Sequence, residues 1–276
     1  MNDTQRQRLS VHVEGGQLTV ERSGEGPTLL MVHGWALDHR MFDPQRDELE
    51  GDLETIVYDR RGFGTSSAPP DLRRETGDIV QVLDTLEISQ AHLLGMSQGG
   101  RIALRFAAEF PERLASLSLQ GPVIDGYSVD EPEHERIPIG HYADLVQAEN
   151  LPEFRRQWRN HPMMALDHAS DKNIALAQLI LEDYEGRDLA AFQMEQYDYD
   201  VNVLPKLARF QQPVLLLTGA KETAARKAQT DKLRQTFPDV REVILERSGH
   251  LSNLTEPRAY NAALRSFCLG VETGRS

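Results

Sequence analysis

The sequence predicts an α/β protein: a mostly parallel eight-stranded sheet with helices on both faces. Three observations favour this class. Short continuous apolar runs, such as Thr28–Val32, have the composition of strands that are buried on both faces. These runs alternate with segments that carry apolar residues at helical spacing, and such alternation is typical of parallel sheets. The chain has 276 residues, which is enough for one large α/β domain or a domain with an insertion.

The elements expected in the first part of the chain follow one another closely. Alternating apolar and polar residues around Gly15 and Gly16 predict a β-hairpin. Further strands are expected at 28–32, 55–58, 91–94 and 114–119, and helices at about 35–49, 73–86 and 101–108. Pro111 is expected to end the last of these helices.

The pattern changes after Pro122. Strand-like runs stop until Pro213, and the intervening stretch carries several prolines and helical pieces at about 142–148 and 172–181. We therefore expect residues 123–205 to form a helical cap, inserted into a core made of residues 1–122 and 206–276. After the insertion the core is expected to resume with a strand at 213–219, a helix at about 224–237, a strand at 242–245 and a last helix at about 256–269.

Composition and charge limit the classes of partner. The chain carries 30 Lys and Arg residues against 43 Asp and Glu residues, a formal net charge of −13. Nucleic acids and anionic membranes would repel such a chain, so we expect neither as a partner. The N-terminus shows no apolar signal segment, no run of about 18 apolar residues follows, and Cys268 is the single cysteine, so a cytoplasmic protein without an intrachain disulfide is expected. The histidines of the insertion lack the spacing of a metal motif, and no metal or cofactor is expected.

The stretch 95–99, Gly-Met-Ser-Gln-Gly, is the most informative motif. It lies between an expected strand and an expected helix, the setting in which Gly-x-Ser-x-Gly holds a nucleophilic serine on a sharp turn. Small neighbours let strand and helix approach, and the strained turn exposes the hydroxyl of Ser97. The backbone N–H of Gln98 lies at the helix start, where it can face a developing oxyanion. The alternative is a glycine-rich loop with an incidental serine, which this setting disfavours.

A serine hydroxyl is too weak an acid to attack unaided, so a base must take its proton. Of nine histidines, His250 lies in a Ser-Gly-His loop after a late expected strand. Ligands of parallel sheets bind at the carboxyl ends of the strands, and Ser97, Trp35, Glu222 and His250 all follow such ends. His250 is therefore the predicted base, with His33 as a lesser alternative.

With these residues placed, the chain resembles the α/β-hydrolase superfamily from about residue 10 to residue 269. The matching motifs are His-Gly-Trp at 33–35, Asp-Arg-Arg-Gly-Phe-Gly-Thr-Ser at 59–66, Gly-Met-Ser-Gln-Gly-Gly at 95–100 and Ser-Gly-His at 248–250. Small capped carboxylesterases and enol-lactone hydrolases look most similar. The resemblance implies that Ser97 is the nucleophile, that His250 is the base and that the backbone N–H groups of Trp35 and Gln98 form the oxyanion hole. It also implies that His33 supports the oxyanion loop, and the loop from Asp59 is expected to be structural.

The acid of the predicted triad departs from the family pattern. Relatives carry aspartate in a Gly-x-x-Asp loop, whereas residues 219–222 here read Gly-Ala-Lys-Glu. Glutamate can serve, because the acid only orients the histidine and stabilises its cation. Another branch of the superfamily places its acid after the preceding strand, where Asp125 lies in this chain. Glu222 is the preferred acid and Asp125 the alternative; a degraded triad is a further alternative.

The leading prediction for function is hydrolysis of a small carboxylic ester or lactone through an acyl-enzyme. A serine nucleophile argues against the haloalkane dehalogenase and epoxide hydrolase branches, which need a carboxylate. A C–C bond hydrolase or a cofactor-free perhydrolase could use the same residues, and a non-catalytic ligand sensor could use the same fold. The cap is expected to roof the substrate pocket, with these candidate lining residues: Tyr142, Phe154, Trp158, Met163, Met164, Phe192 and Met194. The oligomeric state is not predicted.

Overall fold

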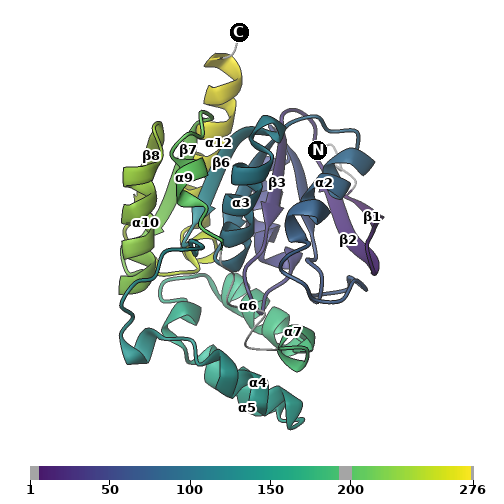
Figure 1. Ribbon diagram of the computed structural model, residues 1–276, viewed down its shortest axis with the longest axis vertical. Helices are drawn as coiled ribbons and strands as arrows, with labels where there is room; N and C mark the ends of the chain where they lie inside the picture. The colour runs from purple at the N-terminus through teal and green to yellow at the C-terminus, as the bar shows by residue number, and fades with distance from the viewer. Residues whose placement is uncertain (1–5, 193–200, 275–276) are drawn as a thin grey trace.

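The centre of the computed structural model, which describes residues 6–192 and 201–274, is an eight-stranded sheet (Figure 1). Its strand order is β1-β2-β4-β3-β5-β6-β7-β8. A hairpin of β1 (Gln7–Val13) and β2 (Gly16–Ser23) forms one edge, and β2 pairs antiparallel with β4 (Glu54–Tyr58). From β4 onward, each strand pairs in parallel with the next one in the sheet order. These strands are β3 (Thr28–Val32), β5 (Ala91–Met96), β6 (Leu114–Gln120), β7 (Val214–Gly219) and β8 (Val240–Leu245). The predicted mostly parallel eight-stranded sheet is confirmed.

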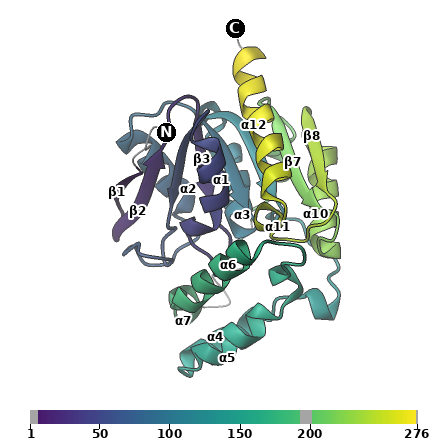
Figure 2. The same cartoon turned by 180° about the vertical axis from the view of Figure 1, so that it is seen from behind.

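Helices cover both faces of the sheet, as a comparison of Figures 1 and 2 shows. One face carries α2 (Glu75–Thr85), α3 (Gln98–Glu109) and α10 (Ala224–Thr236), and the other carries α1 (Asp43–Leu49), α11 (Ser252–Thr255) and α12 (Pro257–Gly274). Strand β3 contributes Leu29 and Met31 to the core on one face and Leu30 and Val32 to the core on the other. The two-sided burial explains why the central strands read as continuous apolar runs.

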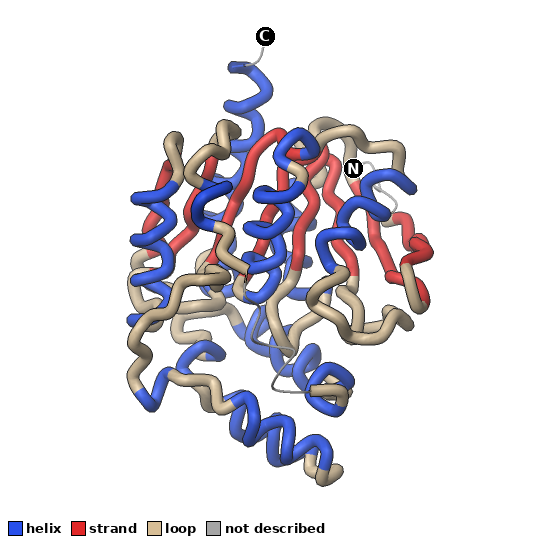
Figure 3. The backbone as a smooth tube through the Cα atoms, viewed as in Figure 1, coloured by secondary structure: helices blue, strands red, loops and turns tan. Residues whose placement is uncertain are grey.

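A helical segment separates β6 from β7, and most of it lies beyond one end of the sheet (Figure 3). The helices there are α4 (Ile139–Gln147), α5 (Leu151–Arg159), α6 (Asp171–Asp183) and α7 (Arg187–Ala190). The last helix of the segment, α9 (Leu204–Leu207), lies beside α3 on one face of the sheet (Figure 1). Short 3-10 turns complete the chain: η1 (His39–Phe42), η2 (Pro111–Arg113), η3 (Glu133–Glu135) and η4 (Pro162–Met164). The core under α1 and α12 continues into this segment through Tyr142, Phe154 and Trp158.

Helices α1 and α5 differ clearly from the expectation. The helix expected from residue 35 begins only at Asp43, because Ala36 has a left-handed φ of 54° and Asp38 caps η1 by accepting the Arg40 N–H at 2.9 Å. Helix α5 was not expected at all. Its Pro152 lies in the first turn, where a missing N–H costs no intrahelical hydrogen bond.

Across the described ranges, no helix combines the length and apolarity that crossing a membrane requires. Met194, one of the residues expected to line the pocket, lies outside the described residues.

Candidate active site

Ser97 forms the turn between β5, which ends at Met96, and α3, which begins at Gln98. Its backbone has φ 55° and ψ −116°, a conformation that costs a residue other than glycine about 1–3 kcal/mol. The surrounding structure holds it there: the Ser97 N–H donates to the Gln120 carbonyl at 2.8 Å, and the Arg101 N–H donates to the Ser97 carbonyl at 3.0 Å. The side chain of Ser97 is half-buried. The turn therefore presents this hydroxyl at the carboxyl edge of the sheet.

The close crossing of strand and helix at this turn requires glycine. A Cβ at Gly95 would lie 2.7 Å from the Cβ of Ala103 and 2.7 Å from the Cα of Gly100. Both distances are well inside ordinary carbon–carbon contact of about 3.5–4.0 Å. The glycine at position 95 thus sets how near α3 lies to β5 and, with it, where Ser97 projects.

Glu222 and His250 meet at the same edge, after β7 and β8. The ring Nδ1 of His250 lies 2.7 Å from Glu222 Oε2, and the Thr223 N–H donates to Glu222 Oε1 at 2.8 Å. Both side chains are buried. Burial alone would raise the pKa of Glu222, but the charge of His250 and the hydrogen bonds to His250 and Thr223 outweigh it, so this pKa lies below its usual value. A carboxylate on Nδ1 favours the tautomer whose Nε2 is free to accept a proton.

Ser97 and His250 both line a cavity of about 20 Å³. That volume suits about one water molecule. Apart from these two side chains, the described residues that line it are apolar: Trp35, Leu37, Met96, Ile137, Trp158, Met163, Met164 and Leu251. Three of the residues expected to line a pocket, Trp158, Met163 and Met164, are among them, whereas Tyr142 and Phe154 pack around the Trp35 ring. The walls favour a small uncharged group beside the hydroxyl.

The loop that carries Trp35 packs against the serine turn. A Cβ at Gly34 would lie 3.4 Å from the Cβ of Ser97, which shows how closely this loop approaches it. The Trp35 ring stacks edge-on to Trp158 with 4.8 Å between ring centroids, and its Nε1–H donates to Asp188 Oδ2 at 2.6 Å. Asp188 belongs to α7 and also accepts the Tyr184 hydroxyl at 2.5 Å. No sequence pattern pointed to Asp188, because it lies 153 positions from Trp35.

The carboxylate of Asp125 accepts hydrogen bonds from two arginine side chains. Arg101 Nε donates to its Oδ1 at 2.6 Å, and Arg105 Nε donates to its Oδ2. Both arginines belong to α3, and the carboxylate is buried against that helix. The structure thus brings Glu222 to His250 and engages Asp125 with two guanidinium groups.

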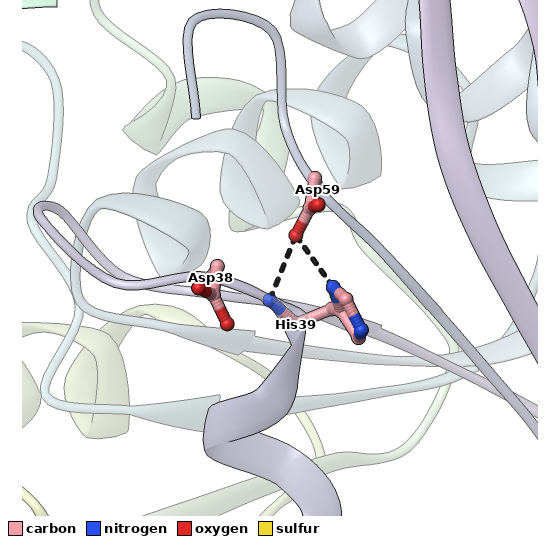
Figure 4. A group of neighbouring side chains, drawn as sticks. All are labelled: Asp38, His39 and Asp59. Atoms are coloured by element: carbon pink, nitrogen blue, oxygen red, sulfur yellow. Dashed lines mark hydrogen bonds and ion pairs between the residues drawn. The ribbon is translucent and has the colours of Figure 1, made fainter. Parts of the chain in front are cut away.

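The loop from Asp59 is tied to the rest of the core by a buried histidine (Figure 4). Asp59 Oδ1 accepts the ring Nδ1–H of His39 at 2.6 Å and its backbone N–H at 3.1 Å, and the other ring nitrogen lies 3.3 Å from Glu21. Burial lowers the pKa of His39, but the hydrogen bonds to Asp59 and Glu21 more than offset it and raise this pKa to about 9. His39 is therefore a cation between two carboxylates.

The donor atoms of Asp38, His39 and Asp59 lie within 4.8 Å of one another, close enough to surround a metal ion. A protonated imidazole cannot ligate a metal, and Asp38 is held by the Arg40 guanidinium, with Nη2 to Oδ2 at 2.6 Å. The donor set therefore fits a structural ion-pair network and does not fit a metal ion.

Residues 27–257 match the family described as alpha/beta hydrolase fold. The RutD protein of Pseudomonas syringae pv. syringae, for which the name proposes carbamate hydrolysis, is 30% identical over 258 residues, which cover 88% of this chain and 94% of that protein. The 3-oxoadipate enol-lactonase 1 of Acinetobacter baylyi is 24% identical over 270 residues, covering 94% of this chain and 96% of that protein. Among solved structures, an esterase from Exiguobacterium antarcticum is similar with a TM-score of 0.81 at 21% identity, covering 95% of this chain and 100% of that one.

Proposed function

The chain belongs to the alpha/beta hydrolase fold family, and from this premise we propose that it is a serine hydrolase of small carboxylic esters or lactones. One observation carries the proposal: Ser97 and His250 line one cavity, while the other side of the His250 ring is hydrogen-bonded to Glu222 at 2.7 Å. The enol-lactonase among its sequence relatives supports the class of reaction. The substrate class is our inference from the small apolar walls of the cavity.

In the proposed acylation step, Ser97 Oγ attacks the carbonyl carbon and His250 Nε2 takes the hydroxyl proton. The carbonyl oxygen gains the negative charge and is held by the N–H groups of Trp35 and Gln98. The intermediate then collapses: the carbon–oxygen bond to the alcohol breaks, and His250 returns the proton to the departing oxygen. Glu222 keeps its negative charge throughout and stabilises the imidazolium that forms between the two proton transfers.

Deacylation repeats the chemistry with water as the nucleophile. His250 takes a proton from the water, the hydroxide adds to the acyl carbon, and the bond to Ser97 Oγ breaks as the proton moves to that oxygen. The apolar walls lower the local dielectric constant, so each hydrogen bond to the developing oxyanion is stronger than it would be in water.

We propose further that residues 123–205 act as a cap on a core made of residues 1–122 and 206–276. This segment supplies Trp158, Met163 and Met164 to the cavity, while the residues proposed for chemistry all belong to the core. Such a division leaves bond cleavage to the core and the choice of acyl or alcohol group to the cap.

A serine-directed probe tests the proposal. A fluorophosphonate should label the wild-type protein on Ser97, and p-nitrophenyl acetate should be hydrolysed. The Ser97→Ala variant should fold, resist labelling and lose turnover on the order of a million-fold, as when other triad serines are removed. Wild-type turnover by the purified, folded variant would contradict the proposal.

A further inference from the structure

We infer that Arg60 is the positioning residue of the oxyanion hole, and that it acts on both proposed donors, Trp35 and Gln98, at once. The inference rests on the proposed function, because it assigns a role within that site. The sequence indicated only a structural loop at 59–66, and nothing in that motif pointed to the oxyanion hole.

The guanidinium of Arg60 bridges the two segments that supply the donors. Its Nη1 donates to the His33 carbonyl at 3.2 Å and lies 3.5 Å from the Gly34 carbonyl. Its Nη2 donates to the side-chain oxygen of Gln98 at 2.8 Å. One fully buried planar group thus holds the loop before Trp35 and the first residue of α3.

The position of the Gly34 carbonyl decides where the Trp35 N–H points. The two groups belong to one peptide unit, which is planar and trans, so the N–H is directed opposite to the carbonyl. Besides the Arg60 Nη1 contact, the Gly34 carbonyl accepts the Nδ1–H of His33 at 2.8 Å. Holding this oxygen therefore fixes the direction of the proposed oxyanion donor.

Arg60 also sets the tautomer of His33. The backbone N–H of Arg60 donates to His33 Nε2 at 3.0 Å, so the ring proton must reside on Nδ1, where it reaches Gly34. Burial lowers the pKa of His33 to about 3, which keeps the ring neutral at ordinary pH. Main chain and side chain of Arg60 thus act on the same peptide unit.

The guanidinium is itself braced. Glu75 on α2 accepts hydrogen bonds from Arg60 Nε at 2.6 Å and from Nη2 at 2.8 Å. The ring centroid of Phe63 lies 4.8 Å from the guanidinium carbon. A bidentate pair restricts both position and rotation of the guanidinium. A buried ion pair adds little net stability compared with apolar side chains of similar volume, so both charges can be replaced together without leaving a buried unpaired charge.

The chain contains a matched control one residue further on. Arg61 is also buried and makes the same kind of pair with α2, donating to Asp78 at 2.6 Å through both Nε and Nη2. Its Nη1 also donates to the Pro69 carbonyl at 3.2 Å and lies 3.5 Å from the Glu14 carbonyl in the turn between β1 and β2. The two pairs share chemistry, burial and helix, and only the Arg60 pair touches the residues at 33, 34 and 98.

The experiment compares Arg60→Met/Glu75→Leu with Arg61→Met/Asp78→Leu. For each we measure the melting temperature, kcat and KM for p-nitrophenyl acetate, and the inhibition constant of a trifluoromethyl ketone, which adds the serine and mimics the oxyanion. We expect the Arg60 pair to lower kcat about 10–100-fold, less than the 10²–10³-fold lost when an oxyanion donor is removed outright. Binding of the ketone should weaken by a similar factor with KM nearly unchanged. The Arg61 pair should shift the melting temperature comparably and keep kcat within about threefold.

Arg60→Lys gives a second, independent test. Lysine preserves the charge beside Glu75, but a single ammonium cannot reach both the Gly34 carbonyl and Gln98, so kcat and ketone affinity should still fall. Wild-type kcat in Arg60→Lys, or equal losses in the two double variants, would overturn the inference and leave Arg60 structural. If the wild-type protein neither turns over the ester nor labels on Ser97, the proposed function fails and the inference falls with it. Normal wild-type activity with unchanged ketone affinity in the Arg60 variants removes the inference alone.

Discussion

Gly121 links the backbone directly to the proposed catalytic pair. It follows the end of β6 with a left-handed φ of +49°, and a Cβ placed there would lie 2.7 Å from His250 Nδ1 and 2.8 Å from Glu222 Oε2. Carbon atoms approach other atoms at about 3.5–4.0 Å, so an added methyl group must push the two side chains apart. Gly121→Ala is therefore expected to disturb the His250–Glu222 pair while both of its members stay unchanged.

The expected losses in activity and stability differ. The left-handed conformation costs alanine about 1–2 kcal/mol, which is the scale of the expected loss of stability. An acid that no longer orients its histidine costs up to about 10⁴-fold in turnover, so a partly displaced pair should lose roughly 10²–10⁴-fold in kcat. Initial rates with p-nitrophenyl acetate and urea unfolding measure the two quantities on the same sample.

Gly15 offers the matched control. It lies in the turn between β1 and β2 and also has a positive φ, +87°, and a Cβ there would lie 3.1 Å from the side chain of Pro69. Gly15→Ala should lower stability to a similar extent and leave kcat within about threefold of wild type. If Gly121→Ala loses stability but keeps wild-type kcat, the close packing of the His250–Glu222 pair is not what turnover depends on, and the reasoning is refuted.

Three further predictions follow from the site and its supports. Glu222→Gln should cost about 10⁴-fold in kcat with little loss of folding, whereas Asp125→Asn should cost far less; the reverse ranking would move the acid to Asp125. Met163→Ala shortens a side chain that lines the cavity and so enlarges the cavity. The ranking of p-nitrophenyl esters by kcat/KM should then shift toward longer acyl groups, and an unchanged ranking would contradict a cap that selects substrate. The folded-state pKa of His39, about 9, lies above its usual value of 6.5. The pair with Asp59 therefore stabilises the folded state fully below about pH 6.5, and this stabilisation is lost as the pH rises through 9. Urea unfolding should show up to about 3 kcal/mol of this pH-dependent stability in wild type, and a His39→Gln variant with the same pH dependence would rule out that assignment.

Much of the fold was predictable because its signals are local. Continuous apolar runs gave the central strands, and residues 95–99 carry the whole requirement for a sharp strand–turn–helix within five positions. Parallel strands place the loops after β7 and β8 at one edge, and Glu222 does lie within hydrogen-bond distance of His250. Their part in catalysis remains a prediction.

The features that the sequence did not indicate depend on contacts between distant segments. Arg60 reads as one more polar residue of a glycine-rich loop until Gln98, 38 positions away, is seen to accept from it. Asp188 gains its contact with Trp35 only when α7 lies over the core. Helix α5 was not among the expected helices, and its Pro152 lies in the first turn, which tolerates proline.

The acyl-enzyme is the central claim, and trapping it is the most direct test. Wild-type protein mixed with excess p-nitrophenyl acetate and quenched in acid on the millisecond scale is digested and analysed by mass spectrometry. The account predicts that the peptide containing Ser97 gains the mass of one acetyl group, and that the modified fraction decays at the rate of steady-state turnover once the ester is exhausted. Turnover without an adduct on Ser97, or an adduct that persists while product continues to form, would contradict it.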